Sequence, residues 1–383
     1  MMQRVGILGG GQLARMTLQA AIALGIEVAI FEREADSPAG RLTQREVVGP
    51  WDDPALRRAF AAHCDIITLE SEFVDPAIMA AFVAAGTPVR PGPATLALVG
   101  DKLRQKEHLA AAGVPLPRFR AIATPDDARR AGEEWGWPVI LKARRLGYDG
   151  YGNATARGPA EVAAAWARLG APERELLVEA FVPFVRELAV MVARAPSGAV
   201  AVYPVVETIQ QHHICHVVRA PAGVAPATAA RAAEIARAAV EAVDAVGVVG
   251  VELFELADGA LLYNELAPRP HNSGHYTIEG CVTSQFENHL RAILDLPLGE
   301  TALVAPAAVM VNVLGRGDGP GEPRGLAAAL AVPDAHPHLY GKRRSRPGRK
   351  MGHVTALGPT VADAEATARR AAEAIVFGVG SRE

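Results

Sequence analysis

Residues 251–265 read VELFELADGALLYNE, and this stretch predicts the architecture around which the rest of the chain is organised. Asp258-Gly259 is a favoured two-residue hairpin turn between two apolar runs. Folding about that turn predicts three cross-strand pairs: Leu256 with Leu261, Phe254 with Tyr263, and Glu252 with Glu265. An odd-length loop would break this pairing, so the register is a specific prediction. Two carboxylates then face each other, with Cβ atoms about 4.5–5.5 Å apart.

Like charges in that position destabilise a sheet unless a cation or a shared proton lies between them. Magnesium fits, because it takes hard oxygen ligands from one or two carboxylates and completes its shell with phosphate oxygens. The alternative is a solvated hairpin with two exposed acids, which the apolar neighbours disfavour: Phe254, Leu256, Leu262 and Tyr263. The hairpin therefore predicts a metal–nucleotide site with Glu252 and Glu265 as the metal ligands.

A glycine-rich loop lies upstream of the hairpin. Residues 138–143, PVILKA, predict a strand that carries Lys142, and the loop 147–153, GYDGYGN, follows it. Its three glycines let the backbone approach a phosphate chain and turn N–H groups toward it. Lys142 is one of only five lysines among the 39 lysine and arginine residues, so its position is informative. A phosphate clamp and an ordinary hairpin both remain open on this pattern.

The first 32 residues predict a strand at 5–8, a glycine turn at 9–11, a helix at 12–24 and a second strand at 26–31, which ends at Glu32. This matches the outline of a dinucleotide fingerprint, in which amide groups at a helix N-terminus bind an anion. Three interpretations follow: a nicotinamide-dependent oxidoreductase, a site for the ribose phosphate of a substrate, and a tight turn without a ligand.

The order of predicted elements divides the chain into three parts. A strand at 65–69 and a helix after Asp75-Pro76 continue the strand–helix alternation, which predicts a doubly wound parallel sheet. Shorter strands follow at 139–142, 176–182, 187–193 and 200–206, then a helix at 228–246, a strand at 307–314 and a last helix at 361–376. We predict a Rossmann-like N-terminal domain (1–105), a small lid domain (106–180) and a larger C-terminal domain (181–383).

Composition excludes several classes of protein. The chain has 383 residues, half of them hydrophobic, and a net charge of −3, which gives no long-range attraction for nucleic acid or an anionic membrane. Its three cysteines lie far apart, which argues against a disulfide framework and a structural zinc site. No apolar run approaches the roughly 18 residues of a membrane span, and the N-terminus starts on a strand pattern. A soluble cytoplasmic enzyme is the expectation.

Residues 264–277, NELAPRPHNSGHYT, closely resemble the N5-carboxyaminoimidazole ribonucleotide synthase family of ATP-grasp ligases. The resemblance covers nearly the whole chain and includes GGGQL at 9–13, GYDG at 147–150, EGCVTSQFE at 279–287 and RKMGH at 349–353. It implies a mixed α/β and α+β ATP-grasp fold and a homodimer. The implied reaction uses ATP and Mg²⁺ or Mn²⁺ in de novo purine biosynthesis. ATP phosphorylates bicarbonate to carboxyphosphate, and the amine of 5-aminoimidazole ribonucleotide takes up the carboxyl group.

The resemblance also implies roles for single residues. Implied nucleotide contacts are Arg104, Lys142, Gly147, Tyr148, Asp149, Gly150, Tyr151, Gly152, Asn153, Glu179, Ala180, Phe181, Val182, Glu187, Gln210, Asn264 and Glu265. Implied ribonucleotide contacts are Glu72, Tyr148, Asp149, Arg269, His271, Lys342 and Arg349, to which the N-terminal loop adds Gly10, Gly11 and Gln12. Of these residues, Lys342 and Arg349 would neutralise the 5′-phosphate of the ribonucleotide. The catalytic residues would be Lys142, Tyr148, Asp149, Arg269 and His271.

Two positions depart from the family pattern: Tyr151 replaces a basic residue, and Gln210 stands where histidine is common. Plainer roles also remain open. Arg104 could be a surface helix residue, Glu72 a helix cap, His271 a loop-orienting residue, and 342–350 a solvated basic face. Other function classes are a formate-dependent ribonucleotide transformylase, an inactive ATP-sensing module and the oxidoreductase, which leaves the carboxylate pair unexplained.

Overall fold

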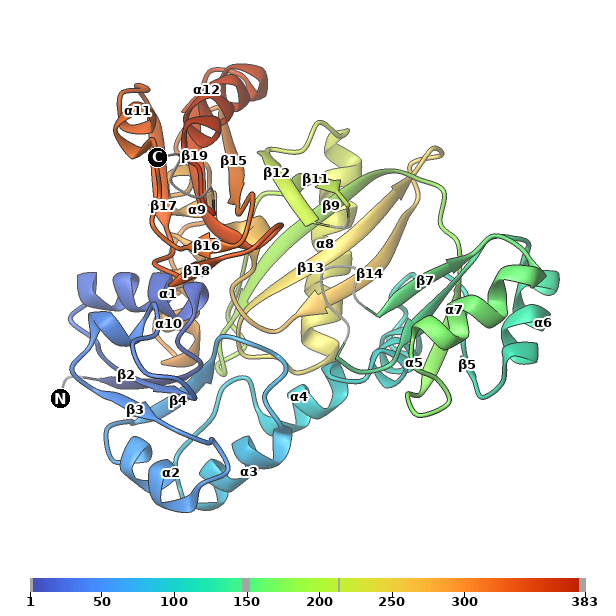
Figure 1. Ribbon diagram of the computed structural model, residues 1–383, viewed down its shortest axis with the longest axis horizontal. Coiled ribbons are helices and arrows are strands. Elements are labelled where there is room, and N and C mark those ends of the chain that lie inside the picture. The colour runs from blue at the N-terminus through green and yellow to red at the C-terminus, as the bar shows by residue number, and fades with distance from the viewer. Residues whose placement is uncertain (1–2, 147–151, 213, 379–383) are drawn as a thin grey trace.

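The computed structural model describes residues 3–146, 152–212 and 214–378, and Figure 1 shows their arrangement. The N-terminal part contains a parallel sheet in the order β3-β2-β1-β4, formed by Glu46–Val48, Glu27–Glu32, Arg4–Leu8 and Ile66–Leu69. The associated helices are α1 (Gln12–Ala23), α2 (Pro54–Ala61), α3 (Pro76–Ala84) and α4 (Pro93–Val99), with a 3₁₀ turn η1 at Gly40–Leu42. Asp75 caps α3 by accepting from the Ala77 amide, and Pro76 is the first helical residue, as predicted.

Helix α5 (Lys102–Ala111) leads into a small lobe on the right of Figure 1. Its antiparallel sheet has the order β5-β8-β6-β7, formed by Phe119–Ile122, Leu176–Ala180, Val139–Ala143 and Asn153–Ala156. Helices α6 (Pro125–Trp135) and α7 (Val162–Arg168) accompany this sheet, with a 3₁₀ turn η2 at Pro159–Glu161. Alternation along β6 buries Val139, Leu141 and Ala143 and leaves Lys142 on the other face, toward the rest of the molecule.

The largest sheet has nine strands in the described part of the chain, in the order β14-β13-β9-β11-β12-β15-β19-β17, with β10 paired to β9. These strands are β9 (Phe184–Arg194), β10 (Val200–Val202), β11 (Val206–Gln211), β12 (Ile214–Ala220), β13 (Gly247–Leu256), β14 (Leu261–Ala267), β15 (Ala307–Leu314), β17 (Ala335–Leu339) and β19 (Lys350–Gly358). The sheet therefore continues from the hairpin of the carboxylate pair to the C-terminal tail.

Helices on this sheet bury two separate apolar cores. Helix α8 (Pro226–Ala242) packs on β9 and β13, while α12 (Val361–Ala374) packs on β15 and β19. The remaining elements are η3 (Asn272–Gly274), α9 (Thr277–Gly280), α10 (Gln285–Ile293), α11 (Leu326–Leu330) and the short pair β16 (Gly319–Pro320) and β18 (Arg344–Ser345). The predicted domain boundaries fall inside α5 and at the end of β8, and they stay predictions.

The register of the hairpin β13–β14 is only partly as predicted. Glu252 does pair with Glu265, but the predicted pairs Phe254–Tyr263 and Leu256–Leu261 are wrong. Leu256 donates its amide to the carbonyl of Ala260 at 2.9 Å, so the loop has odd length and contains Gly259 at a φ of +81°. A β-bulge next to Glu252 takes up the extra residue, and this restores the opposition of the two carboxylates.

None of the described helices combines the length and apolar composition that crossing a membrane requires.

Candidate active site

The two carboxylates of the hairpin face one another and a lysine. Lys102 Nζ lies 2.8 Å from Glu265 Oε2, and Asn264 Nδ2 lies 3.5 Å from Glu252 Oε2. Lys102 lowers the pKa of Glu265 to about 2, whereas burial and the neighbouring Glu265 raise the pKa of Glu252 to about 8. One carboxyl of the pair is therefore ionised and the other protonated at neutral pH. The Glu265 side chain is 47% exposed, so the ionised carboxylate is open to a ligand.

A second group of charges lies beside the pair, around the buried Glu179 of β8. Lys106 and Lys142 approach its carboxylate from α5 and β6, at 3.2 and 2.9 Å. Although burial opposes it, the two ammonium groups lower the pKa of Glu179 to about 2, and burial lowers the pKa of Lys106 to about 8. Lys106 also donates to the Asn264 carbonyl at 3.3 Å, which joins this group to the hairpin. With Lys102, three lysines gather beside the hairpin, and such a group of cations suits a polyphosphate.

The structure places Arg104 outside the lysine group, and its predicted contact with the nucleotide stays a prediction. Its side chain is exposed on α5, and residues two apart on a helix do not face the same side. Lys102 and Lys106 are four apart, share one face of α5 and contact Glu265 and Glu179. Sequence reasoning missed both lysines. The scarcity of lysine was a signal that could have identified them. Three of the five lysines of the chain lie in this group, and the other two are Lys342 and Lys350 of the basic segment 342–350.

The predicted adenine segment, Glu179–Val182, connects β8 to β9. The Glu179 side chain faces the lysines, and the Ala180 amide donates to the Arg118 carbonyl at 2.8 Å. Farther along, Glu187 of β9 accepts a hydrogen bond from Gln210 of β11, and burial raises the pKa of Glu187. The structure therefore brings Glu187 and Gln210 together, and the contacts of these residues and of Glu179–Val182 with a nucleotide stay predictions.

Two residues predicted to bind the ribonucleotide bind each other. Arg269, after β14, donates to Glu72, after β4, with an Nη2–Oε1 distance of 2.8 Å. Glu72 is not the cap of α3, because Asp75 fills that role. His271 follows on the same loop, and its Nε2 lies 3.7 Å from Glu252 Oε1. Burial lowers the pKa of His271 to about 3, so the ring is neutral here.

The basic segment 342–350 contains the two residues predicted to bind the 5′-phosphate, Lys342 and Arg349. Lys342 Nζ donates to the Lys350 carbonyl at 2.7 Å, and Arg349 Nη1 donates to the Arg344 carbonyl at 2.7 Å. Burial and the neighbouring Arg349 lower the pKa of Lys342 to about 7. Cationic groups gathered in this way suit a phosphate monoester.

The N-terminal glycine loop is already occupied by carboxylates. Glu70 accepts from the amides of Gly11 and Ala14 at 2.8 and 3.2 Å, and Glu32 accepts from the Gly10 amide at 2.7 Å. A Cβ atom at Gly11 would lie 2.5 Å from Glu70, so the glycine serves this close approach. The Gly10 and Gly11 amides therefore already have partners within the protein, and their predicted contact with a substrate phosphate stays a prediction. The same bonds weigh against a dinucleotide at this helix N-terminus.

Part of the predicted phosphate cover lies outside the described residues: Gly147, Tyr148, Asp149, Gly150 and Tyr151. At its end, Gly152 accepts from the Ala143 amide at 2.8 Å, and Asn153 pairs with Lys142 across β6 and β7. These contacts anchor the end of the loop beside the lysine group.

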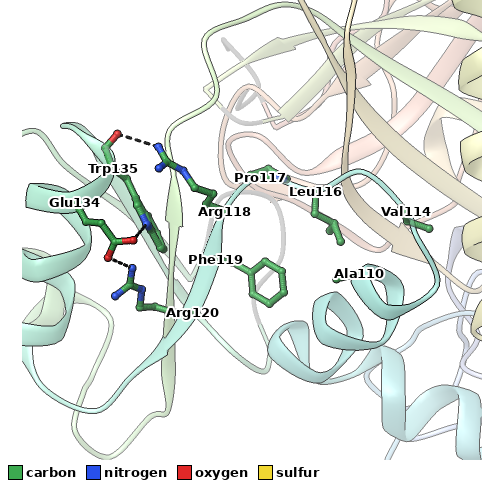
Figure 2. A pocket seen from close by; sticks show the side chains of 9 residues that line it. All are labelled: Ala110, Val114, Leu116, Pro117, Arg118, Phe119, Arg120, Glu134 and Trp135. Atoms are coloured by element: carbon green, nitrogen blue, oxygen red, sulfur yellow. Dashed lines mark hydrogen bonds and ion pairs between the residues drawn. The ribbon is translucent and has the colours of Figure 1, made fainter.

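A cavity of about 450 Å³ lies elsewhere, between α5, β5 and α6, as Figure 2 shows. Phe119 and Leu116 line it, and Arg118 and Arg120 lie over the Trp135 ring at 5.7 and 4.5 Å. None of the predicted site residues lines this cavity. Two of its lining residues nevertheless adjoin the site, because Arg118 accepts from the Ala180 amide and Phe119 pairs with Glu179 across β5 and β8.

The chain matches known proteins over most of its length. Three family models match in succession: the ribonucleotide synthetase preATP-grasp domain over residues 2–100, the ATP-grasp domain over 107–286, and the phosphoribosylaminoimidazole carboxylase C-terminal domain over 308–367. The N5-carboxyaminoimidazole ribonucleotide synthase of Synechococcus elongatus is 47% identical over 92% of this chain and 89% of its own. That of Mycobacterium tuberculosis is 45% identical over 94% of this chain and 84% of its own.

Solved structures give the same result. The Aspergillus clavatus N5-carboxyaminoimidazole synthase in complex with ADP and 5-aminoimidazole ribonucleotide has a TM-score of 0.89 and 37% identity, over 97% of this chain and 98% of its own. The N5-carboxyaminoimidazole ribonucleotide synthetase of Thermotoga maritima has a TM-score of 0.87 and 38% identity, over 99% and 100% of the two chains.

Proposed function

The chain belongs to the N5-carboxyaminoimidazole ribonucleotide synthase family of ATP-grasp ligases, and from this premise we propose its reaction and the residues that perform it. It is an ATP-dependent ligase of purine biosynthesis that carboxylates 5-aminoimidazole ribonucleotide. One observation carries the assignment of the site: His271 Nε2 lies 3.7 Å from Glu252 Oε1. That contact joins the segment proposed for the ribonucleotide to the carboxylate pair proposed for the nucleotide.

In our proposal the nucleotide lies over the lysine group. Lys102, Lys106 and Lys142 carry three positive charges against the two ionised carboxylates Glu179 and Glu265. The excess positive charge favours a polyphosphate, and an incoming phosphate oxygen competes with Glu265 for Lys102. Such side chains stabilise negative charge that develops on a transferred phosphoryl group.

The donor set of the hairpin fits a divalent cation. Glu252 and Glu265 supply hard oxygens from opposite strands. The high pKa of Glu252 reflects its burial and the like charge of Glu265, and a bound cation would relieve the repulsion between the two carboxylates. We propose these two residues as the ligands of Mg²⁺ or Mn²⁺. The described residues contain no group of three or more acidic, histidine or cysteine side chains that could hold a metal ion. A magnesium ion held by two carboxylates takes its other ligands from phosphate and water. When bound, the ion would neutralise charge on the phosphates.

Bicarbonate is the proposed third substrate. It is a poor electrophile, and transfer of the ATP γ-phosphoryl group to it forms carboxyphosphate and ADP. The amine of the ribonucleotide then takes the carboxyl carbon, and inorganic phosphate leaves. In this proposal Arg269 and His271 orient the imidazole end, and Lys342 with Arg349 bind the 5′-phosphate. Carboxyphosphate hydrolyses readily, so closure against water is part of the proposal.

ADP release with each substrate omitted in turn tests this proposal. We expect fast release only when ATP, bicarbonate and 5-aminoimidazole ribonucleotide are all present. Release that depends on formate instead of bicarbonate would favour a transformylase and contradict the proposal. The homodimer and the cytoplasmic location are also proposals, for which sedimentation and cell fractionation are the direct measurements.

A further inference from the structure

A buried cluster of polar rings lies between the C-terminal strands and the loop before α9. Its central members, His275, Tyr340 and His353, have side chains that are at most 1% exposed. His338 and Glu279 form its edge, where His338 Nε2 lies 2.6 Å from Glu279 Oε1. The cluster is outside the residues assigned above to ATP, the metal and the ribonucleotide.

The rings contact one another in a continuous series. His353 stacks on His338 with centroids 4.6 Å apart, and it lies 5.0 Å from His275. The Tyr340 hydroxyl lies 3.0 Å from His353 Nδ1. Tyr340 also contacts a cation through the face of its ring, because Lys342 Nζ lies 5.6 Å from the ring centroid. Tyr340 therefore links His353 directly to the lysine proposed to bind the 5′-phosphate.

The opposite end of the series holds the backbone of His271. Gln285 Oε1 accepts from the His271 amide at 2.9 Å, and Gln285 Nε2 donates to the His271 carbonyl at 2.8 Å. These two bonds fix the orientation of the Gln285 amide. Its remaining N–H group donates to His275 Nδ1 at 3.1 Å. Because Nδ1 accepts, the neutral His275 ring carries its proton on Nε2.

Sequence spacing makes the cluster a connection between the two halves of the ribonucleotide site. His275 is four residues after His271, Tyr340 is two residues before Lys342, and His353 is four residues after Arg349. No hydrogen bond between described residues links His271 directly with Lys342 or Arg349, so their separation depends on what lies between them.

A core built for stability alone would not contain these groups. Within the described residues, His275 Nε2, His353 Nε2, Glu279 Oε2 and Thr355 Oγ1 are buried side-chain atoms without a hydrogen-bond partner. Such atoms lower stability, and apolar side chains of similar volume often remove this cost. Burial also lowers the pKa of both His275 and His353, which keeps the rings neutral. The polar cluster is therefore better explained by fixed geometry than by stability.

We propose that His353 is a positioning residue that holds the Lys342–Arg349 segment in register with the Arg269–His271 segment, acting through Tyr340 on one side and His275 on the other. The inference rests on the proposed function, since it assigns a task to residues that do not touch the substrates.

Steady-state kinetics of the full-length chain test the proposal with His353→Leu, which keeps volume and removes both ring nitrogens. A displaced binding segment can change kinetics by up to about 100-fold. We expect KM for 5-aminoimidazole ribonucleotide to rise about tenfold or more, KM for ATP to stay within about twofold, and the melting temperature not to fall. His353→Asn, which keeps an acceptor near the Nδ1 position, should recover part of the loss.

Tyr340→Phe removes the same hydrogen bond from the other partner and keeps the ring under Lys342. It should raise KM for the ribonucleotide in the same direction, and it decides the matter if His353→Leu does not fold. The exposed His63 is the control, as His63→Leu should change neither KM. An unchanged KM for the ribonucleotide in Tyr340→Phe and in folded His353→Leu, or an equal rise in both KM values, overturns the positioning role. A wild-type chain without ribonucleotide-dependent ADP release would instead overturn the proposed function.

Discussion

Lys102 Nζ lies 2.8 Å from Glu265 Oε2, so a residue from the helix that follows the N-terminal part neutralises the open member of the carboxylate pair. Glu252, across the hairpin, has His271 rather than a lysine within 4 Å of its carboxylate. The two acids therefore have different electrostatic surroundings. Lys102 keeps Glu265 ionised. The charge of Glu252 depends instead on whether a cation binds between the two carboxylates.

Glu265→Gln should nearly abolish turnover and leave the fold intact. The substitution keeps shape but removes the charge proposed to hold the cation, and the loss of one such electrostatic group typically lowers kcat about 100- to 1,000-fold. ADP release under saturating substrates measures the loss, and circular dichroism verifies the fold. The matched control is Glu173→Gln, which changes an exposed glutamate of the lid and should retain full activity. Turnover of Glu265→Gln within about twofold of wild type would contradict the assignment.

Lys102→Met and Arg104→Met form a pair that separates the two candidate cations of α5. Loss of Lys102 removes a charge at Glu265, so KM for ATP should rise about tenfold, the effect of 1.4 kcal/mol at 25 °C. Arg104 is exposed on another side of the helix, and its substitution should leave KM for ATP unchanged. If an ATP titration showed a larger rise in KM for Arg104→Met than for Lys102→Met, Arg104 would be the phosphate contact.

The sequence predicts the elements of the fold and the opposition of Glu252 and Glu265 well, because alternation and turn chemistry are local. It does not predict how the opposition arises. The loop between β13 and β14 has odd length, and the compensating bulge depends on the packing of the hairpin in the sheet. The sequence analysis missed both the odd length of the loop and the bulge. Their effects on the register compensate each other, so the predicted pair of Glu252 and Glu265 still forms.

Long-range partners account for the other differences. Glu70 occupies the amides of Gly11 and Ala14 from more than 50 residues away, which no local pattern of the glycine loop reports. The prediction named Arg104 instead of Lys102 for a simpler reason. The two residues are two positions apart on a helix and therefore point to different sides of it. The helical period, applied to the segment 102–106, would have favoured the two lysines.

Lys342→Ala should weaken binding of the ribonucleotide and leave the nucleotide end unaffected. Its ammonium lies among Arg349 and Lys350, where a 5′-phosphate is proposed to bind, so KM for the ribonucleotide should rise about tenfold or more while KM for ATP stays constant. Arg343→Ala is the control, because Arg343 is exposed and paired with Asp36. An unchanged KM for the ribonucleotide in Lys342→Ala would remove Lys342 from the phosphate site.

Acid should destabilise the fold through His289, which joins the N-terminal sheet to the central one. His289 Nδ1 accepts from the Val248 amide at 3.1 Å, so its proton is on Nε2, which donates to Thr68 of β4 at 2.9 Å. A charged ring would turn an N–H group toward the Val248 N–H group. Burial lowers the pKa of His289 from 6.5 to about 4, so the unfolded chain binds more protons than the folded one between these values.

The free energy of unfolding should therefore fall as the pH decreases from about 6.5 to about 4, and it should be insensitive to this group above pH 7. Urea denaturation across that range measures the slope. His289→Gln cannot take up the proton and should give a shallower slope, although buried His271, His275 and His353 keep part of it. His63→Gln, at an exposed position, should retain the wild-type slope. Equal slopes in wild type and His289→Gln would show that protonation of His289 does not account for the loss of stability in acid, and they would contradict the prediction.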